Sequence, residues 1–251
     1  MAFALAAFSF AALAGGIPGI SPASAQEYAE PTPEEVLRTA TDYLENLKSF
    51  SFKCELAEDT PFEGGREVKS LHDMTYYVKR PDKLRFRTVG DLRNRQWFYD
   101  GKTLTAQDLS RNLYSQVVLS STIDGILTRA RDELNLRLAV TALGKTDLYE
   151  MLVENVKDSV IVGMSRVRGI PCYQLLLERD EVDLQLWIQA GKHPLLRKAV
   201  IRYKKEEGKP EWGAVFTKWN TSPRLADSFF EFKPPRGATR IEFLRQVLPK
   251  P

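Results

Sequence analysis

The strongest constraint on the fold of this 251-residue chain is a long series of segments in which apolar and polar side chains alternate. Leu84 and Phe86 share one face of such a segment, with Arg85 on the other. Asp100-Gly101 between two of these segments is a strong hairpin signal. The alternation predicts antiparallel strands over residues 50–56, 74–78, 83–88, 96–99, 102–107, 114–119, 156–167, 172–178, 182–189, 195–205, 212–219 and 229–232.

Helical periodicity replaces the alternation in three places. A capping box, with Thr32 as N-cap and Glu35 completing it, starts an amphipathic helix that runs to about Leu47. A central insertion over residues 122–138 has the same apolar spacing, and a shorter helix is predicted over residues 147–152. The apolar stripes of the first helix and the insertion make them lid candidates, represented by Leu37, Leu44, Ile126 and Leu127.

These patterns together predict a mainly β protein with helices, of the α+β class. About ten or eleven strands form one large curved antiparallel sheet, a half-open barrel, because twisted sheets of that size curl. The N-terminal helix and the central helical insertion are expected to cover the apolar inner face, since their own apolar stripes have no other partner. No linker interrupts residues 26–251, so we expect a single domain after the first 25 residues.

The first 25 residues have the character of a secretory signal peptide. They contain no charged residue, have an apolar run from Phe3 to Leu13, and end in Ala23-Ser24-Ala25, which predicts cleavage before Gln26. The apolar run is too short to span a bilayer, which takes roughly 20 residues. The Lys or Arg that usually opens a signal peptide is missing, so we expect the true translation start to lie upstream. The sequence therefore predicts a periplasmic product of residues 26–251.

Residues that carry catalytic chemistry are sparse. His72 and His193 are the two histidines, and neither lies in a metal-ligand or nucleophile motif. We therefore expect a protein that is not an enzyme and that has no cofactor and no metal. Cys54 and Cys172 lie far apart in the sequence without metal-ligand spacing. Their pattern leaves two alternatives open, a disulfide in an oxidising compartment or two buried thiols.

The charge of the chain is close to balanced, with 36 basic and 33 acidic residues. A net charge of +3 does not predict nucleic-acid binding. One cluster of arginines lies close to aromatic residues and has two interpretations, a surface for nucleic acid or phospholipid or the solvated outer face of the sheet. Strict alternation with core residues favours the solvated face for Arg80, Arg85, Arg87, Arg93 and Arg95.

The apolar inner face is either an ordinary core or the wall of a ligand cavity. A wide curled sheet under a few helices is hard to fill completely with side chains, which favours a cavity. In the periplasm, a lipid that crosses between two membranes needs an apolar container, because exposing an acyl chain to water costs about 0.8 kcal/mol per CH₂.

At this point the order of the motifs resembles a known superfamily, that of the outer-membrane lipoprotein carrier LolA. Within it, the chain is most similar to a group of predicted periplasmic proteins without an assigned function. The similarity covers nearly the whole chain after the signal segment and is carried by 80–86 (RPDKLRF), 98–102 (FYDGK), 112–114 (NLY), 169–173 (GIPCY), 184–188 (LQLWI), His193-Pro194 and 230–237 (FEFKPPRG). The resemblance implies a curved antiparallel sheet lidded by helices, with an apolar groove for acyl chains or a lipidated partner.

The leading hypothesis is a periplasmic carrier or chaperone that holds acyl chains of a lipoprotein or lipid in this groove. We expect a monomer that makes peripheral contact with membranes. The alternative is an envelope regulatory or structural module that binds a protein partner and carries no lipid. The candidate groove residues are Phe52, Met74, Tyr76, Leu84, Phe86, Trp97, Tyr99, Leu184, Leu186 and Ile188.

Overall fold

The computed structural model describes residues 30–63, 66–91, 93–132 and 139–242. The chain divides into two units, 1–30 and 31–251, and the fold described is that of the second unit. The predicted signal peptide and residues 133–138 of the predicted central helix lie outside the described residues. Within the described ranges, no helix has both the length and the apolar character needed to span a membrane.

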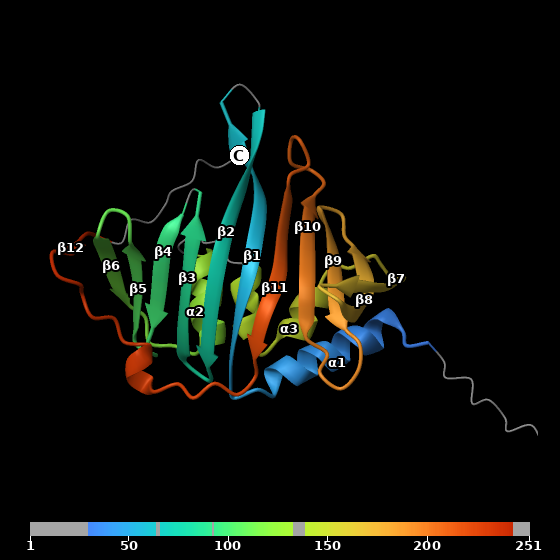
Figure 1. Ribbon diagram of the computed structural model, residues 1–251, viewed down its shortest axis with the longest axis horizontal. Helices are drawn as coiled ribbons and strands as arrows, with labels where there is room; N and C mark the ends of the chain where they lie inside the picture. The colour runs from blue at the N-terminus through green and yellow to red at the C-terminus, as the bar shows by residue number, and fades with distance from the viewer. Residues whose placement is uncertain (1–29, 64–65, 92, 133–138, 243–251) are drawn as a thin grey trace, which may run out of the picture. The chain divides into compact units, whose positions relative to one another are not determined.

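The described part of the second unit contains one sheet of twelve strands (Figure 1). The strand order is β12-β6-β5-β4-β3-β2-β1-β11-β10-β9-β8-β7, so the sheet stays open. The predicted α+β class and large curved antiparallel sheet are confirmed, with β12 as an added parallel partner of β6. The strands are β1 Ser49–Phe62, β2 Arg66–Lys79, β3 Lys83–Gly90, β4 Asn94–Tyr99, β5 Thr103–Asp108, β6 Leu113–Val118, β7 Asp158–Val167, β8 Ile170–Glu178, β9 Val182–Gln189, β10 Leu196–Tyr203, β11 Glu211–Asn220 and β12 Thr239–Arg240.

All strands of this sheet except β12 belong to two meanders. The first runs from β1 to β6, and the second runs from β7 to β11. They join through the pairing of β1 with β11, which aligns Phe52 with Trp219 and Cys54 with Phe216. This pairing between distant parts of the sequence brings the last long strand to the middle of the sheet.

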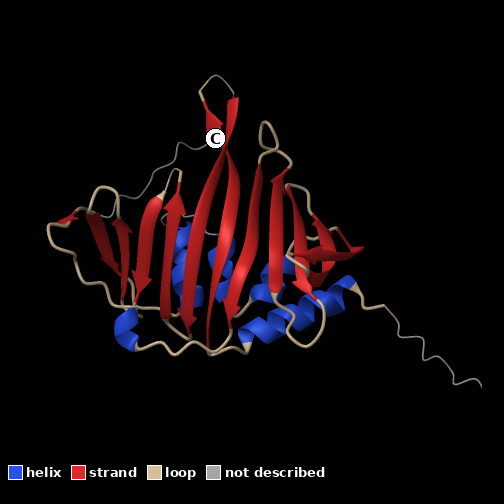
Figure 2. Cartoon of the chain, viewed as in Figure 1, coloured by secondary structure: helices blue, strands red, loops and turns tan. Residues whose placement is uncertain are grey.

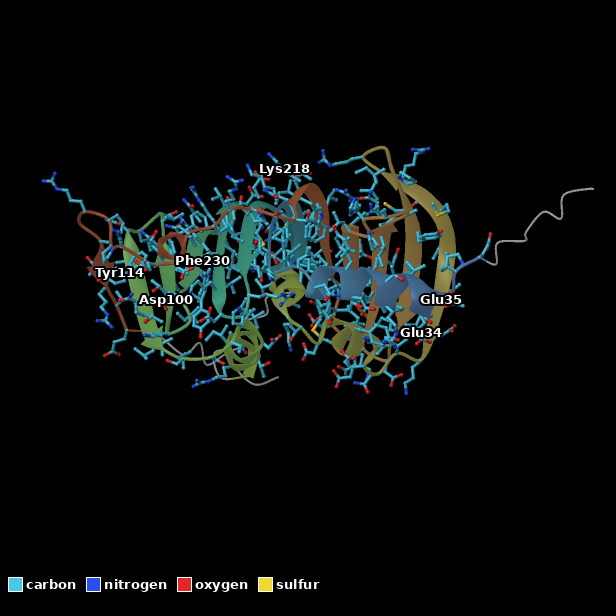
Figure 3. All side chains as sticks on the ribbon, turned by 90° about the horizontal axis from the view of Figure 1, so that it is seen from below. Glu34, Glu35, Asp100, Tyr114, Lys218 and Phe230 are labelled. Carbon is cyan, nitrogen blue, oxygen red and sulfur yellow. The ribbon has the colours of Figure 1, made fainter. Side chains whose placement is uncertain are left out.

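The helices lie on one face of the sheet (Figure 2), except the short 3-10 helix of residues 227–229, which packs on the other face. The predicted capping box at the start of α1 is present, because the Thr32 hydroxyl accepts from Glu35 N at 3.2 Å and Thr32 N donates to Glu35 Oε2 at 2.8 Å. Figure 3 shows Glu35 near the N-terminal end of α1. The helices are α1 Pro33–Glu45, α2 Ile123–Asp132, the 3-10 helix η1 Ala139–Gly144, α3 Leu148–Val153 and the 3-10 helix η2 Asp227–Phe229.

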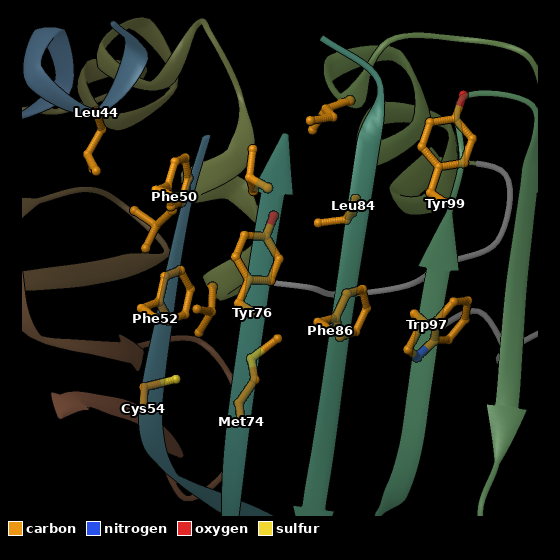
Figure 4. Close-up of a cluster of buried hydrophobic side chains, with 14 of the residues drawn as sticks. Leu44, Phe50, Phe52, Cys54, Met74, Tyr76, Leu84, Phe86, Trp97 and Tyr99 are labelled. Atoms are coloured by element: carbon orange, nitrogen blue, oxygen red, sulfur yellow. The ribbon is translucent and has the colours of Figure 1, made fainter. Parts of the chain in front are cut away.

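Two apolar clusters lie between the helices and the sheet. The larger one joins β1 to β5 with α2 and η1, and its side chains include Phe52, Tyr76 and Phe86 (Figure 4). The smaller one joins the start of α1 to β8, β9 and β10 and includes Leu37 and Leu186. Thus α1 covers the second meander, whereas α2 and η1 cover the first.

The C-terminal segment corrects two expectations about the outer face. Residues 229–232 do not form the predicted strand: they begin in η2 and continue as a loop that lays Phe230 and Phe232 on the sheet. The ring centroid of Phe232 lies 5.3 Å from that of Phe98. It also lies 5.0 Å from the ring centroid of Tyr114, so the aromatic side chains of this segment pack on the outer face instead of pairing as a strand.

The C-terminal segment also covers Arg85. The prediction that this residue lies on a solvated outer face was therefore wrong. Its guanidinium lies 4.5 Å from the ring centroids of both Phe98 and Phe229. Its Nη1 also donates to the Phe229 carbonyl at 3.1 Å. Arg87 and Arg95 are exposed, as the alternation predicts for a charged side chain.

Candidate functional site

A cavity of about 350 Å³ lies between the helices and the second meander. Its floor is formed by inward-facing side chains of β9, β10 and β11, and its roof is formed by α1, α2, η1 and α3. The lining residues are Leu37, Ala40, Thr41, Leu44, Leu127, Thr128, Val140, Thr141, Ala142, Leu143, Lys145, Leu148, Met151, Leu152, Arg179, Val182, Leu184, Leu186, Ile188, Leu196, Ala199, Ile201, Tyr203, Trp212 and Phe216.

The local periodicities explain the apolar walls. Leu37 and Leu44 are two helical turns apart, so they face the cavity from the same side of α1. Leu186 and Ile188 alternate along β9 and point into it together. Ala199 of β10 lies directly opposite Leu186 in the strand register. Its small side chain leaves volume at the floor that a larger residue would occupy.

The structure separates the sequence-predicted groove residues into two groups. Leu184, Leu186 and Ile188 line the cavity. The others lie in the packed core under the first meander instead. That second group comprises Phe52, Met74, Tyr76, Leu84, Phe86, Trp97 and Tyr99.

Aromatic stacking and buried hydroxyl groups account for the filled core. Phe86 and Trp97 stack with ring centroids 5.8 Å apart and an interplanar angle of 14°. The Tyr76 hydroxyl donates to the Thr141 carbonyl at 2.8 Å, and burial raises its pKa. The Tyr99 hydroxyl donates to the Ser121 carbonyl at 2.7 Å. These contacts fix η1 and the start of α2 against the first meander. The cavity lies over the second meander instead.

The structure places the four predicted lid residues in two environments. Leu37 and Leu44 of α1 and Leu127 of α2 line the cavity. Ile126 is buried in the larger apolar cluster instead.

Sequence reasoning missed the wall formed by β10, β11 and α3, including Ala199, Trp212, Phe216 and Met151. The alternation of β10 and β11 placed these strands correctly. It did not indicate that they lie beside β9 and under α1.

Contacts to backbone carbonyl groups hold the roof in place. Arg80, at the end of β2, donates from Nε to the Leu47 carbonyl at 3.2 Å and from Nη2 to the Lys145 carbonyl at 3.2 Å. Its Nη1 donates to the Gly144 carbonyl. Burial lowers the pKa of this guanidinium, with the charge of Asp124 opposing. Arg80 therefore joins the chain after α1 to the end of η1 and is not a solvated outer-face residue.

Two cationic side chains line the cavity. Lys145 Nζ lies 3.0 Å from Asp147 Oδ2. Arg179 follows β8 and donates from Nη2 to the Leu152 carbonyl at 2.7 Å and the Met151 carbonyl at 3.3 Å, at the end of α3. The remaining lining is mainly aliphatic and aromatic, so the cavity suits an apolar ligand with at most a small polar part.

The two histidines have structural contacts. His72 is buried on β2, and burial lowers its pKa while the charge of Glu58 opposes. His193 Nδ1 lies 3.1 Å from the Tyr43 hydroxyl, in a turn that leads into β10. Among the described residues, no group of three or more His, Cys, Asp or Glu side chains is placed to hold a metal ion.

Both cysteines are free and buried, so no disulfide joins Cys54 and Cys172. Cys54 lies in the inner apolar cluster beside Phe52. Cys172 lies on the other face, because its neighbour Tyr173 pairs with Ile188, which points into the cavity. The two thiols therefore lie on opposite faces of the sheet. Burial raises the pKa of Cys54 to about 12.

The fold and the cavity define a class, that of an open curved sheet with helices on one face over an apolar cavity. The chain belongs to the family described as "Predicted periplasmic protein (DUF2092)", whose model matches residues 33–244. The expected similarity to predicted periplasmic proteins is thereby confirmed. No curated protein matches the chain.

Several solved structures are similar at low sequence identity. A LolA superfamily protein from Nitrosomonas europaea is 10% identical, with 81% of this chain and 99% of that chain covered and a TM-score of 0.42. The lipoprotein LppX from Mycobacterium tuberculosis is 14% identical, with 77% and 97% covered and a TM-score of 0.47. The MucA/MucB complex from Pseudomonas aeruginosa is 17% identical, with 80% of this chain and 61% of that chain covered and a TM-score of 0.46. Similarity at this level does not define a function for the chain.

Proposed function

We propose that this chain is a periplasmic, non-catalytic binding protein that holds an acyl chain of a lipid or lipoprotein in the cavity under the second meander. The observation that carries the proposal is the nearly continuous apolar lining between α1 and β9 to β11. Its volume of about 350 Å³ lies within the roughly 300–1,000 Å³ typical of small-molecule sites. The periplasmic description of the family supports the location.

Burial of methylene groups supplies the driving force for such binding. Each CH₂ transferred from water to an apolar environment contributes about 0.8 kcal/mol. A chain that buries ten methylenes gains about 8 kcal/mol before the entropy cost of association is subtracted. Specific polar contacts are therefore not needed for useful affinity, and binding is non-covalent and reversible.

Entry and release of a chain require the roof to move relative to the sheet. The contacts of Arg80 with three carbonyl groups hold the roof closed. Leu148 N donates to Glu45 Oε1 at 3.0 Å, which joins α3 to the end of α1. We expect α1, η1 and α3 to shift together when a chain enters, because these contacts link them.

The test compares two substitutions at adjacent positions of β10 that point to opposite faces. Ala199→Phe places a ring in the cavity, whereas Val200→Phe places the same ring on the outer face. The purified protein should bind a fluorescent fatty acid and should carry lipid detectable by mass spectrometry after expression in its native host. Ala199→Phe should weaken probe binding at least about tenfold, a change of about 1.4 kcal/mol, and Val200→Phe should leave it unchanged. Absence of both native lipid and probe binding in the wild type refutes the proposal.

A second candidate, binding of a protein partner, is favoured by the edge strand β7. Within the described residues, β7 pairs with β8 alone. The centre of β7, from Ser159 to Ser165, has no charged residue. The exposed fractions of Val160, Val162 and Met164 are 45%, 56% and 57%. Edge strands usually carry charges that prevent pairing, so this one suits an extended peptide added as a further strand. Val162→Lys should abolish capture of such a partner and leave fatty-acid binding intact, and equal capture by both proteins argues against this site.

A further inference from the structure

The charged side chains that line the cavity differ in how their charge is balanced. Lys145 is paired with Asp147. Arg179 forms no salt bridge with any residue in the described part of the chain. Neither Asp nor Glu is among the described residues that line the cavity. Among the described residues that line the cavity, Arg179 is therefore the one cationic side chain that forms no salt bridge.

The hydrogen bonds of Arg179 leave part of its guanidinium available. A guanidinium has five N–H donors. Nη2 donates to the Met151 and Leu152 carbonyls, which complete the last turn of α3. Nε is buried and has no hydrogen-bond partner among the described residues. Burial lowers the pKa of this guanidinium, with Glu154 opposing, as expected for a cation removed from water.

A buried N–H without an acceptor costs free energy. Arg179 also lines the cavity, so an acceptor that enters the cavity lies beside a guanidinium whose hydrogen-bonding capacity is only partly used. Capping by Nη2 also holds the guanidinium at one place on the wall, so an incoming acceptor does not have to order it. An anionic oxygen is the partner that a guanidinium binds most strongly.

We infer that the cavity takes a single-chain amphiphile with an anionic headgroup, a carboxylate or a phosphate, which accepts hydrogen bonds from Arg179 while the chain lies between α1 and β9. This inference rests on the proposed function and adds the chemical class of the ligand. The volume of about 350 Å³ is near the lower end of the usual range for ligand sites and suits one chain better than several.

The test compares two fluorescent probes that share one polyene chain, a fatty acid and the corresponding fatty alcohol. Their affinities for the full protein are measured at a pH where the carboxylate is ionised. The wild type should bind the acid at least about tenfold more tightly than the alcohol. Competition with lysophosphatidic acid and with oleate then distinguishes a phosphate headgroup from a carboxylate, and displacement by either supports the anionic class.

Three variants separate the role of Arg179 from general effects of charge. Arg179→Met should lose the preference for the acid and still bind the alcohol, which also shows that the cavity remains folded. Arg179→Lys should keep part of the preference, because it retains the charge and loses the guanidinium geometry. Lys157→Met removes an exposed lysine that pairs with Asp180 near the same turn and should keep the full preference.

The outcomes distinguish this inference from the proposed function. If the wild type binds neither probe, the proposed function fails. If it binds acid and alcohol equally, the acyl-chain site stands and the anionic headgroup is refuted. A preference that persists in Arg179→Met, or disappears in Lys157→Met, refutes the assignment of Arg179.

Discussion

The division of the inner face into a packed half and a hollow half can be tested with one truncation in each. Phe86 is 3% exposed and stacks on Trp97 in the packed core. Phe86→Ala removes a buried ring that has neighbours on all sides, and such changes cost about 3–5 kcal/mol. A typical domain has about 5–15 kcal/mol of stability, so the loss is large relative to the total.

Leu186 is the matched position in the hollow half. It is 4% exposed, but one side of its side chain already faces the cavity. Leu186→Ala therefore forfeits fewer packing contacts, and its cost should be near the lower limit of about 2 kcal/mol for such truncations. It should, however, weaken binding of a fluorescent fatty acid, whereas Phe86→Ala should not.

Guanidinium denaturation followed by tryptophan fluorescence measures both stabilities, and probe titration well below the transition measures both affinities. The expected result is a larger stability loss for Phe86→Ala and a larger affinity loss for Leu186→Ala. If Phe86→Ala costs less than about 2 kcal/mol, the first meander is not tightly packed. If Phe86→Ala lowers the affinity for the probe more than Leu186→Ala does, the probe binds outside this cavity.

Three further predictions concern buried polar groups. A thiol reagent should label neither Cys54 nor Cys172 in the native protein and both after unfolding; rapid native labelling would contradict their burial. Burial lowers the folded-state pKa of His72 below the ordinary 6.5, so the unfolded state binds more protons as the pH falls below that value, and stability decreases there. His72→Gln should flatten this decrease in denaturation curves measured across that range, and an unchanged slope refutes it. Arg80→Met leaves three carbonyl groups without their donor and should cost about 3 kcal/mol or more in unfolding free energy, with faster release of a bound probe; unchanged release kinetics would show that Arg80 does not restrain the roof.

The sequence predicted most of the secondary structure because its signals are local. The capping box at Thr32 and Glu35 fixes the start of α1, and the strict alternation fixes which side chains of β3 and β9 point inward. The prediction of a strand at 229–232 was wrong for a related reason. Its alternating aromatic residues pack on the outer face, and local periodicity does not distinguish this from strand pairing.

The location of the cavity depended on tertiary structure alone. Leu84 of β3 and Leu184 of β9 look alike in the sequence, since both are inward-facing leucines on alternating strands. Leu84 lies in the packed core and Leu184 in the cavity wall. Side chains of α2 and η1 fill the space over the first meander, whereas α1, α2, η1 and α3 together leave a gap over the second. Side-chain periodicity determines the face on which a residue lies, but empty volume depends on how far apart the layers lie. The pairing of β1 with β11 and the packing of the helices on the sheet are both contacts between distant parts of the chain, which local periodicity does not encode.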